Sequence, residues 1–191
     1  MDFDGVIFDM DGTLTEAVLD FAAIRAELGI AEGLPILETI SALDDPARAA
    51  AERVLLAHEL RAARTAGLAQ GAGEVLDRIA AAGLVKALLT RNTREAMGII
   101  LQRFGLQFDL AWSREDGPIK PSPASVLAAC EKLHISPART LCVGDYLYDL
   151  QAANAAGCRS VLLARPGNRQ FASQAHHVIE ELPQLLPILG L

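Results

Sequence analysis

The sequence is poor in lysine. Only Lys86, Lys120 and Lys132 occur, against fourteen arginines, and acidic residues outnumber basic ones to give a formal net charge of −7. A protein that binds a nucleic-acid backbone needs a basic surface to displace counterions, so this balance argues against a general nucleic-acid-binding protein. It is compatible with a small anionic substrate held by a few local cations, which makes each lysine a candidate for that role.

Cysteine and long apolar runs are scarce as well. The cysteines Cys130, Cys142 and Cys158 are widely spaced among apolar neighbours and lack any zinc-binding spacing, which indicates reduced, partly buried thiols. No apolar stretch approaches the roughly 20 residues that span a bilayer. The acidic start, MDFDGVIFD, is unlike a positively charged signal peptide. We therefore expect a cytoplasmic protein without membrane association.

Proline is limited to nine residues in 191, and hydrophobic residues make up 51% of the chain against 21% charged residues. This composition is typical of a folded protein rather than a disordered one. The length is sufficient for one main domain with a small insert.

Short strand-like runs alternate with helical patterns along most of the chain. Strands are expected at 5–9, 85–90, 140–143 and 160–163, with a weaker candidate at 108–112, and helices at 74–82, 93–104, 123–133 and 148–156. A short apolar run at 177–179 and a last helix near Pro183 complete the pattern. The alternation predicts an α/β fold in which helices cover both faces of a parallel sheet. Ligands of such sheets bind beyond the carboxyl ends of the strands.

Residues 16–70 interrupt this alternation with a helical insert. Apolar residues recur at helical spacing up to Gly29, which reads as a helix stop, and Asp44, Asp45 and Pro46 open a long alanine-rich helix that reaches about Thr65. We expect Phe21 in the core of this insert. Arg25 is expected at the surface, with recognition of a substrate carboxylate as the alternative. The insert directly follows an acidic motif and is placed to cover it.

That motif, VIFDMDGTLT, ends an apolar strand with Asp9 and Asp11. A simple Asp-Gly turn is the alternative reading, but LCVGDYLYDL places Asp145 after another strand and Asp149 one helical turn later. Two like charges about 4 Å apart cost roughly 4 kcal/mol at a surface-like dielectric, so four gathered carboxylates require a cation. A site made only of oxygen ligands favours Mg²⁺.

A carboxylate beside Mg²⁺ can attack phosphorus and form an aspartyl-phosphate. That reaction needs donors for the phosphoryl oxygens. LLTRN supplies Thr90 at a strand end, and IKPSP supplies Lys120 in a proline-stiffened loop. Each has a simpler explanation, as a strand-end residue or a solvated lysine, but their joint occurrence in this order favours a phosphate site.

Together DMDGT, the Thr90 strand end, KPSP and GDYLYD resemble, in order and spacing, the four motifs of the haloacid dehalogenase-like (HAD) hydrolase superfamily. The resemblance is to its first subfamily, which includes phosphoglycolate phosphatases. It implies a Rossmann-like three-layer catalytic core formed by residues 1–15 and 71–191, with 16–70 as a reduced helical cap. It also implies a phosphoric monoester hydrolase.

The resemblance implies specific roles for the acidic residues. Asp9 would be the nucleophile and a metal ligand, and Asp11 the general acid and base, binding Mg²⁺ through its backbone carbonyl. Asp145 would ligate Mg²⁺ and Asp149 would support it. A raised pKa of Asp11 beside a negative neighbour suits proton transfer.

The residues expected at the phosphoryl group are Thr90, Arg91, Asn92 and Lys120. Thr90 and Lys120 follow from the resemblance, whereas Arg91 stands where many relatives have asparagine. Arg91 is either solvated or an additional charged donor to the phosphate or to the anionic tail of the substrate. For Asn92 the preferred interpretation is a helix cap, with Glu95 three residues later completing a capping box.

The expected activity is Mg²⁺-dependent hydrolysis of a small phosphorylated metabolite, with phosphoglycolate suggested by the resemblance. HAD dehalogenases lack the second aspartate, and phosphonate-cleaving members use a cap lysine, which residues 16–70 do not contain. One alternative is a phosphomutase similar to β-phosphoglucomutase. Another is a non-catalytic receiver-like module phosphorylated on aspartate, although receivers carry that residue on a middle strand.

Overall fold

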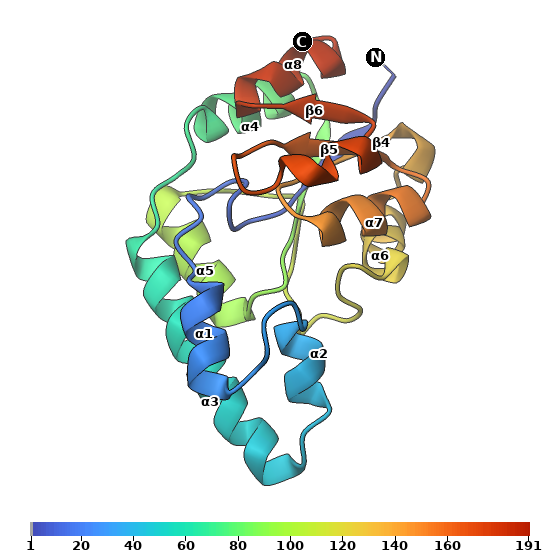
Figure 1. Ribbon diagram of the computed structural model, residues 1–191. Helices are drawn as coiled ribbons and strands as arrows, with labels where there is room; N and C mark the ends of the chain where they lie inside the picture. Colours follow the sequence, from blue (N-terminus) through green and yellow to red (C-terminus); the bar gives the residue numbers. More distant parts are fainter. Residues whose placement is uncertain (1) are drawn as a thin grey trace.

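The computed structural model describes residues 2–191. Its centre is a parallel six-stranded sheet with strand order β3-β2-β1-β4-β5-β6, shown in Figure 1. The strands are β1 (Gly5–Phe8), β2 (Val85–Leu89), β3 (Leu110–Trp112), β4 (Thr140–Gly144), β5 (Arg159–Leu163) and β6 (His177–Ile179). The predicted parallel α/β fold is confirmed. The short runs at 108–112 and 177–179 supply the two edge strands.

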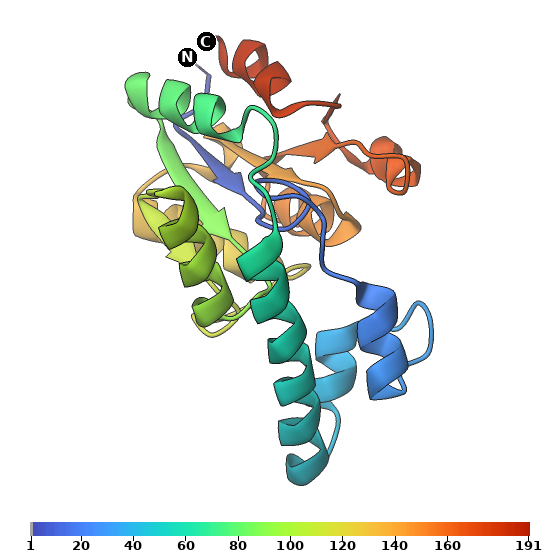
Figure 2. The ribbon, with the colours of Figure 1, turned by 90° about the vertical axis from the view of Figure 1, so that its left-hand side faces the viewer.

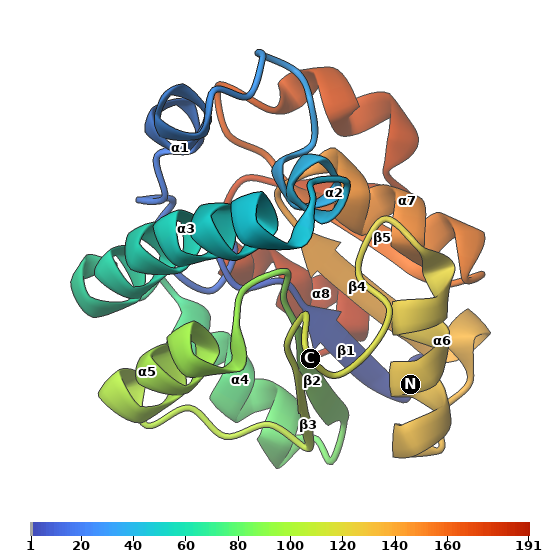
Figure 3. The same cartoon turned by 90° about the horizontal axis from the view of Figure 1, so that it is seen from below.

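Helices cover both faces of the sheet, as Figure 3 shows. One face carries α4 (Ala72–Ala81), α5 (Arg94–Phe104) and α8 (Leu185–Leu189), and the other carries α6 (Pro123–Leu133) and α7 (Leu147–Ala155). Three short 3₁₀ helices lie in the connections: η1 (Pro137–Arg139), η2 (Arg169–Gln174) and η3 (Leu182–Gln184). The sheet is therefore the middle of three layers.

The strand sequences are apolar on both faces because both faces are buried. Val6 and Phe8 of β1 pack with α4 and α5, whereas Ile7 between them packs with α6 and α7. Full burial of one such side chain contributes about 1.5–3 kcal/mol. The central strand β1 is thereby fixed, and the residues that follow it are held at the edge of the sheet where its neighbours β2 and β4 also end.

The insert forms α1 (Phe21–Leu28), α2 (Ile36–Ser41) and α3 (Asp45–Thr65). These helices extend beyond the carboxyl ends of the strands, in the lower half of Figure 1. They enclose a small core of their own, formed by Ile24, Ile36, Ile40, Ala51 and Leu55. As predicted, α1 ends at Gly29 in a left-handed conformation with φ 66°, and α3 follows Asp44, whose side chain caps the helix.

The long helix α3 connects the insert to the rest of the molecule, as Figure 2 shows. Its first half contributes Ala51 and Leu55 to the core of the insert. Its second half packs against α5 and places Ala63 in the main core. Arg103 of α5 donates to the carbonyls of Ala63 at 2.5 Å and Ala66 at 3.0 Å, which satisfies groups at the end of α3.

The predicted burial of the cysteines is confirmed, because Cys130, Cys142 and Cys158 are all buried free thiols. Within residues 2–191, none of the helices combines the length and apolarity needed to cross a bilayer.

Candidate active site

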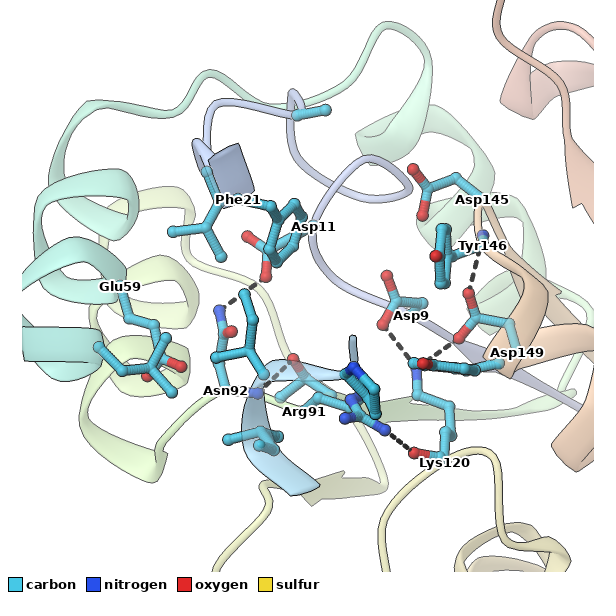
Figure 4. Close-up of a pocket in the computed structure, with 18 of the residues that line it drawn as sticks. Asp9, Asp11, Phe21, Glu59, Arg91, Asn92, Lys120, Asp145, Tyr146 and Asp149 are labelled. Atoms are coloured by element: carbon cyan, nitrogen blue, oxygen red, sulfur yellow. Dashed lines mark hydrogen bonds and ion pairs between the residues drawn. The ribbon is translucent and has the colours of Figure 1, made fainter. Parts of the chain in front are cut away.

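A cavity of about 310 Å³ lies between the carboxyl ends of β1, β2 and β4 and the helical insert, and Figure 4 shows it in close-up. Its lining includes all eight residues that the sequence nominated: Asp9, Asp11, Thr90, Arg91, Asn92, Lys120, Asp145 and Asp149. They come from four separate segments of the chain. The parallel sheet brings them together because its strands end at a common edge.

Three carboxylates form a tight cluster in this cavity. One oxygen from each of Asp9, Asp145 and Asp149 lies within 4.8 Å of the others. We call these three residues the carboxylate cluster. The side chain of Asp11 lies apart from it and accepts a hydrogen bond from Asn92 Nδ2 at 2.6 Å. Asp9 therefore lies in the carboxylate cluster, whereas Asp11 contacts Asn92, although only one residue separates the two acids.

Lys120 is the cation that the carboxylate cluster encloses. Its Nζ donates to Asp9 Oδ1 at 2.5 Å and to the carbonyl of Leu89 at 2.6 Å, and lies 2.6 Å from Asp149 Oδ1. Only 4% of Lys120 is exposed. Burial alone would lower the pKa of Lys120, but the charges of Asp149 and Asp9 raise it above its usual value. The ammonium group is therefore charged and fixed.

The positive charge of Lys120 does not fully compensate the negative charges of the carboxyl groups in this cavity. Burial raises the pKa of Asp9 well above its usual value, although Lys120 opposes the shift. Burial, and then the charge of Asp149, raise the pKa of Asp145 to about 7. Burial, and then the charge of Glu59, raise the pKa of Asp11 to about 6. Because the excess charge is negative, the carboxylate cluster favours a bound cation.

The backbone around the carboxylate cluster leaves no room for additional side chains. A Cβ on Gly12, which has φ 78°, would overlap the carboxylate of Asp145, and one on Gly144 would overlap that of Asp149. The loop after β1 therefore lies directly against Asp145. An oxygen-only set of ligands closely packed in this way fits a small, hard divalent cation.

Two supporting contacts hold the acids that follow β4. Asp149 Oδ2 accepts from the backbone N–H of Tyr146 at 3.0 Å. Asn168, which is buried, donates from Nδ2 to the carbonyls of Asp145 at 2.6 Å and Leu163 at 3.0 Å. Sequence reasoning missed Asn168, because it lies in a glycine-containing loop 23 residues beyond Asp145 in the chain.

In the segment after β2, the structure differs from the prediction for the cap of α5. The N-cap of α5 is Thr93, whose hydroxyl accepts from Ala96 N at 3.3 Å, so the prediction that Asn92 caps this helix is wrong. Thr93 is one residue nearer to the helix start, and the Asn92 amide instead reaches across to Asp11. The Thr90 hydroxyl accepts from Asn92 N at 3.1 Å, which folds this segment into a tight turn at the cavity.

Arg91 connects the sheet edge to the insert. Its Nη2 donates to both carboxylate oxygens of Glu38 on α2, at 2.9 Å each, and its Nη1 donates to the carbonyl of Lys120. The guanidinium lies over the ring of Tyr148, 4.7 Å from its centre. The side chain of Arg91 is therefore neither free nor fully solvated.

A second ion pair joins the insert to the core. Glu59 of α3 pairs with Arg114 and accepts from Thr93 N at 3.3 Å, while Arg114 also donates to the carbonyl of Arg91 at 3.1 Å. The two side chains are 3% and 15% exposed. Glu59 was missed because a glutamate in an alanine-rich helix usually lies in solvent, and its partner is 55 residues away in the chain.

The insert contributes a largely apolar wall to the cavity. Phe21, which was expected in the core of the insert, is part of this wall. Phe21 is 51% exposed and lines the cavity, so the prediction that it is buried in the core of the insert is wrong. Ile24, one turn further along α1, occupies that core instead. Tyr146 packs edge-on against Tyr148, with ring centres 5.1 Å apart.

The sequence and the fold are both similar to those of known hydrolases. A sequence model of the haloacid dehalogenase-like hydrolases matches residues 3–157. A haloacid dehalogenase-like hydrolase domain-containing protein of Arabidopsis thaliana is 33% identical over 175 residues, covering 85% of this chain and 71% of that protein. The phosphoglycolate phosphatase of Thiobacillus denitrificans is 34% identical over 181 residues, covering 80% and 79%. A hydrolase from Pseudomonas syringae has a similar fold, with a TM-score of 0.80, 24% identity and 98% coverage of each chain.

Proposed function

Because this chain belongs to the haloacid dehalogenase-like hydrolases, we propose that it is a Mg²⁺-dependent phosphatase that hydrolyses a small phosphomonoester through an aspartyl-phosphate on Asp9. The main support is the arrangement of three groups in one cavity. Lys120 holds one oxygen of Asp9, the other oxygen of Asp9 points towards Asp145, and Asp11 lies separately with its own hydrogen-bond partner.

In the first step, a carboxylate oxygen of Asp9 attacks phosphorus and the bond from phosphorus to the ester oxygen breaks. The leaving oxygen takes the proton of Asp11. Burial and the charge of Glu59 raise the pKa of Asp11 to about 6, so the acid form is available near neutral pH. The Asn92 amide, 2.6 Å from Asp11 Oδ2, orients the carboxyl group for this transfer.

In the second step, water attacks phosphorus and the bond to the Asp9 oxygen breaks. Asp11, now ionised, takes the proton of the attacking water, and inorganic phosphate leaves. Both enzyme carboxyl groups thereby return to their initial state. Asp11 is only partly buried and lies apart from the carboxylate cluster, so it can exchange a proton while Asp9 carries the phosphoryl group.

The phosphoryl oxygens need donors, and four residues are assigned to this role: Thr90, Arg91, Asn92 and Lys120. Lys120 is already fixed by Asp9 and Asp149, so its charge requires no reorganisation during the reaction. Arg91 would have to give up part of its contact with Glu38 to reach the phosphoryl group.

The metal would be held by the carboxylates of Asp9 and Asp145 and the backbone carbonyl of Asp11, with Asp149 in support. When bound, Mg²⁺ neutralises charge on the phosphoryl oxygens and on the carboxylate cluster. Residues 16–70 are assigned as the cap and residues 1–15 and 71–191 as the catalytic core. The cavity of about 310 Å³ is at the small end of the range for ligand pockets, which favours a small metabolite such as phosphoglycolate.

Turnover of p-nitrophenyl phosphate with and without Mg²⁺ tests this proposal. We expect activity that requires Mg²⁺ and falls by at least about 10⁴-fold in Asp9→Asn, because the nucleophile is lost. Asp77→Asn, at an exposed position of α4, is the matched control and should retain full activity. Unchanged activity in Asp9→Asn would refute the mechanism. Stable phosphorylation of the protein without turnover would favour the receiver-like alternative.

A further inference from the structure

The cap side of the cavity contains two arginines whose charges are compensated differently. Arg91 forms its forked contact with the carboxylate of Glu38. Arg25, on α1, also lines the cavity, but no carboxylate among residues 2–191 forms an ion pair with it. One arginine is therefore neutralised by the cap, whereas the other keeps an uncompensated positive charge.

Carbonyl groups hold Arg25 in place. Its Nε and Nη2 donate to the carbonyl of Leu34 at 3.3 and 3.2 Å, and its Nη1 donates to the carbonyl of Phe21 at 3.3 Å. These contacts fix the orientation of the guanidinium without cancelling its charge. Because an arginine has five N–H groups, one remains on each terminal nitrogen. Two parallel N–H groups match the two oxygens of a carboxylate.

The surroundings of Arg25 make such a ligand favourable. Apolar side chains form much of the cap-side lining of the cavity, among them Leu19, Phe21, Leu37 and Leu55. In a cavity with such walls the effective dielectric is lower than in water, so an unpaired guanidinium attracts an anion more strongly than at an open surface. Arg91 is a poorer partner for the same anion, because the anion would have to displace Glu38.

We infer that Arg25 determines the specificity of the site by binding a carboxylate on the alcohol portion of the substrate, so that the preferred substrates are small phosphorylated hydroxy acids. This inference rests on the proposed function; it extends phosphoglycolate to phosphorylated hydroxy acids in general and adds the residue that recognises their carboxylate. The phosphoryl end of the substrate would lie at the carboxylate cluster and Lys120, and the carboxylate end at Arg25.

Two esters of nearly equal size test the inference. Phosphoglycolate carries a carboxylate where 2-hydroxyethyl phosphate carries a neutral hydroxymethyl group. For the wild-type protein we expect kcat/KM to be about 10- to 100-fold higher for phosphoglycolate, the effect of one hydrogen-bonded charge pair. In Arg25→Gln this preference should disappear through a higher KM for phosphoglycolate, whereas kcat/KM for the neutral ester should stay within about twofold.

Two further variants separate recognition from structural damage. Arg25→Lys retains the charge but not the fork, and it should restore part of the preference. Arg53→Gln removes a charge from an exposed position of α3 in the same cap and should leave the preference unchanged. A distorted cap in Arg25→Gln would lower kcat/KM for both esters alike.

The outcomes are distinguishable from a failure of the proposed function. Equal kcat/KM for the two esters in the wild-type protein, or an unchanged preference in Arg25→Gln, would overturn the inference and leave the phosphatase intact. An equal loss for both esters in Arg25→Gln would also overturn it. If neither ester nor p-nitrophenyl phosphate is hydrolysed with Mg²⁺, the proposed function fails, and the inference fails with it.

Discussion

The two walls of the cavity are built differently. On the sheet edge, Lys120 is buried and the carboxylate cluster is largely buried, and strands whose apolar residues pack on both faces hold these side chains in place. On the cap side, the short helices α1 and α2 and the first half of the long helix α3 share a small core of their own, and Glu38 and Glu59 make ion pairs that join these helices to the catalytic core. Under the proposed function, the sheet sets the reacting groups, whereas recognition depends on the insert, and one of the insert's two ion pairs to the core is partly exposed.

The walls also differ in charge. The sheet edge carries more carboxylates than its single lysine compensates, and burial raises the pKa values of Asp145 and Asp11 to about 7 and about 6. The cap wall carries Arg25, whose charge no carboxylate among residues 2–191 compensates, and much of the rest of this wall is apolar. An ion of opposite charge is therefore expected at each wall, a cation at the first and an anion at the second.

Metal removal combined with a change of pH should have the largest effect, and it tests the sheet edge. Asp11 and Asp145 titrate at about 3.9 in the unfolded chain but at about 6 and about 7 in the folded protein. The contribution of Asp11 and Asp145 to the free energy of unfolding is therefore highest below about pH 4 and is lost as the pH rises through about 7. Each unit of pKa shift corresponds to about 1.4 kcal/mol, so the metal-free protein should melt several degrees lower at pH 8 than at pH 5.

Mg²⁺ should reverse this loss, because it compensates the ionised carboxylates. Thermal melts in EDTA and in Mg²⁺ at both pH values provide the measurement. We expect Mg²⁺ to raise the melting temperature at pH 8 and to have a much smaller effect at pH 5. A metal-free protein that is more stable at pH 8 would show that the sheet edge carries no excess negative charge.

The sheet edge was also the more predictable wall. Asp9, Thr90 and Asp145 each follow an apolar strand, and the carboxyl ends of parallel strands meet at one edge. The alternation of strands and helices therefore placed these three residues at one edge, whereas Lys120, in a loop, was assigned to the site by its motif and by the family resemblance. The weaker strand candidate at 108–112 corresponds to β3 (Leu110–Trp112), and the helix predicted at 123–133 has the observed bounds of α6.

The cap wall was less predictable because its contacts join residues far apart in the chain. Glu38 and Arg91 are 53 residues apart, and neither position carries a local signal for the pairing. The six-residue helix α2 (Ile36–Ser41) is too short to establish a helical period and was not predicted. Phe21 follows the same apolar spacing as Ile24, but periodicity does not reveal which residue of a stripe will face a cavity.

Replacement of Glu59 should have the next largest effect, because this residue is the buried connection between cap and core. Glu59→Gln leaves Arg114 without its charge partner, and breaking a buried ion pair costs about 3 kcal/mol or more. The melting temperature should then fall by roughly 6–12 °C. Glu52→Gln, at an exposed position of the same helix, is the control and should change it little. Equal melting temperatures for both variants would mean that the buried pair does not fasten the cap.

Replacement of Glu38 should have the smallest effect, and it measures how weakly the outer part of the cap is attached. The Arg91–Glu38 pair has fork geometry, but the two side chains are 20% and 41% exposed, so solvent and salt screen the attraction. We expect Glu38→Gln to cost about 0.5–1 kcal/mol, or roughly 1–4 °C. A double-mutant cycle with Arg91→Gln, followed by thermal melts at low and high salt, isolates the coupling between the two side chains. A coupling energy above about 2 kcal/mol that persists at high salt would place the Arg91–Glu38 contact in the range of buried ion pairs. The cap wall would then be held as firmly as the sheet edge, which would contradict the comparison.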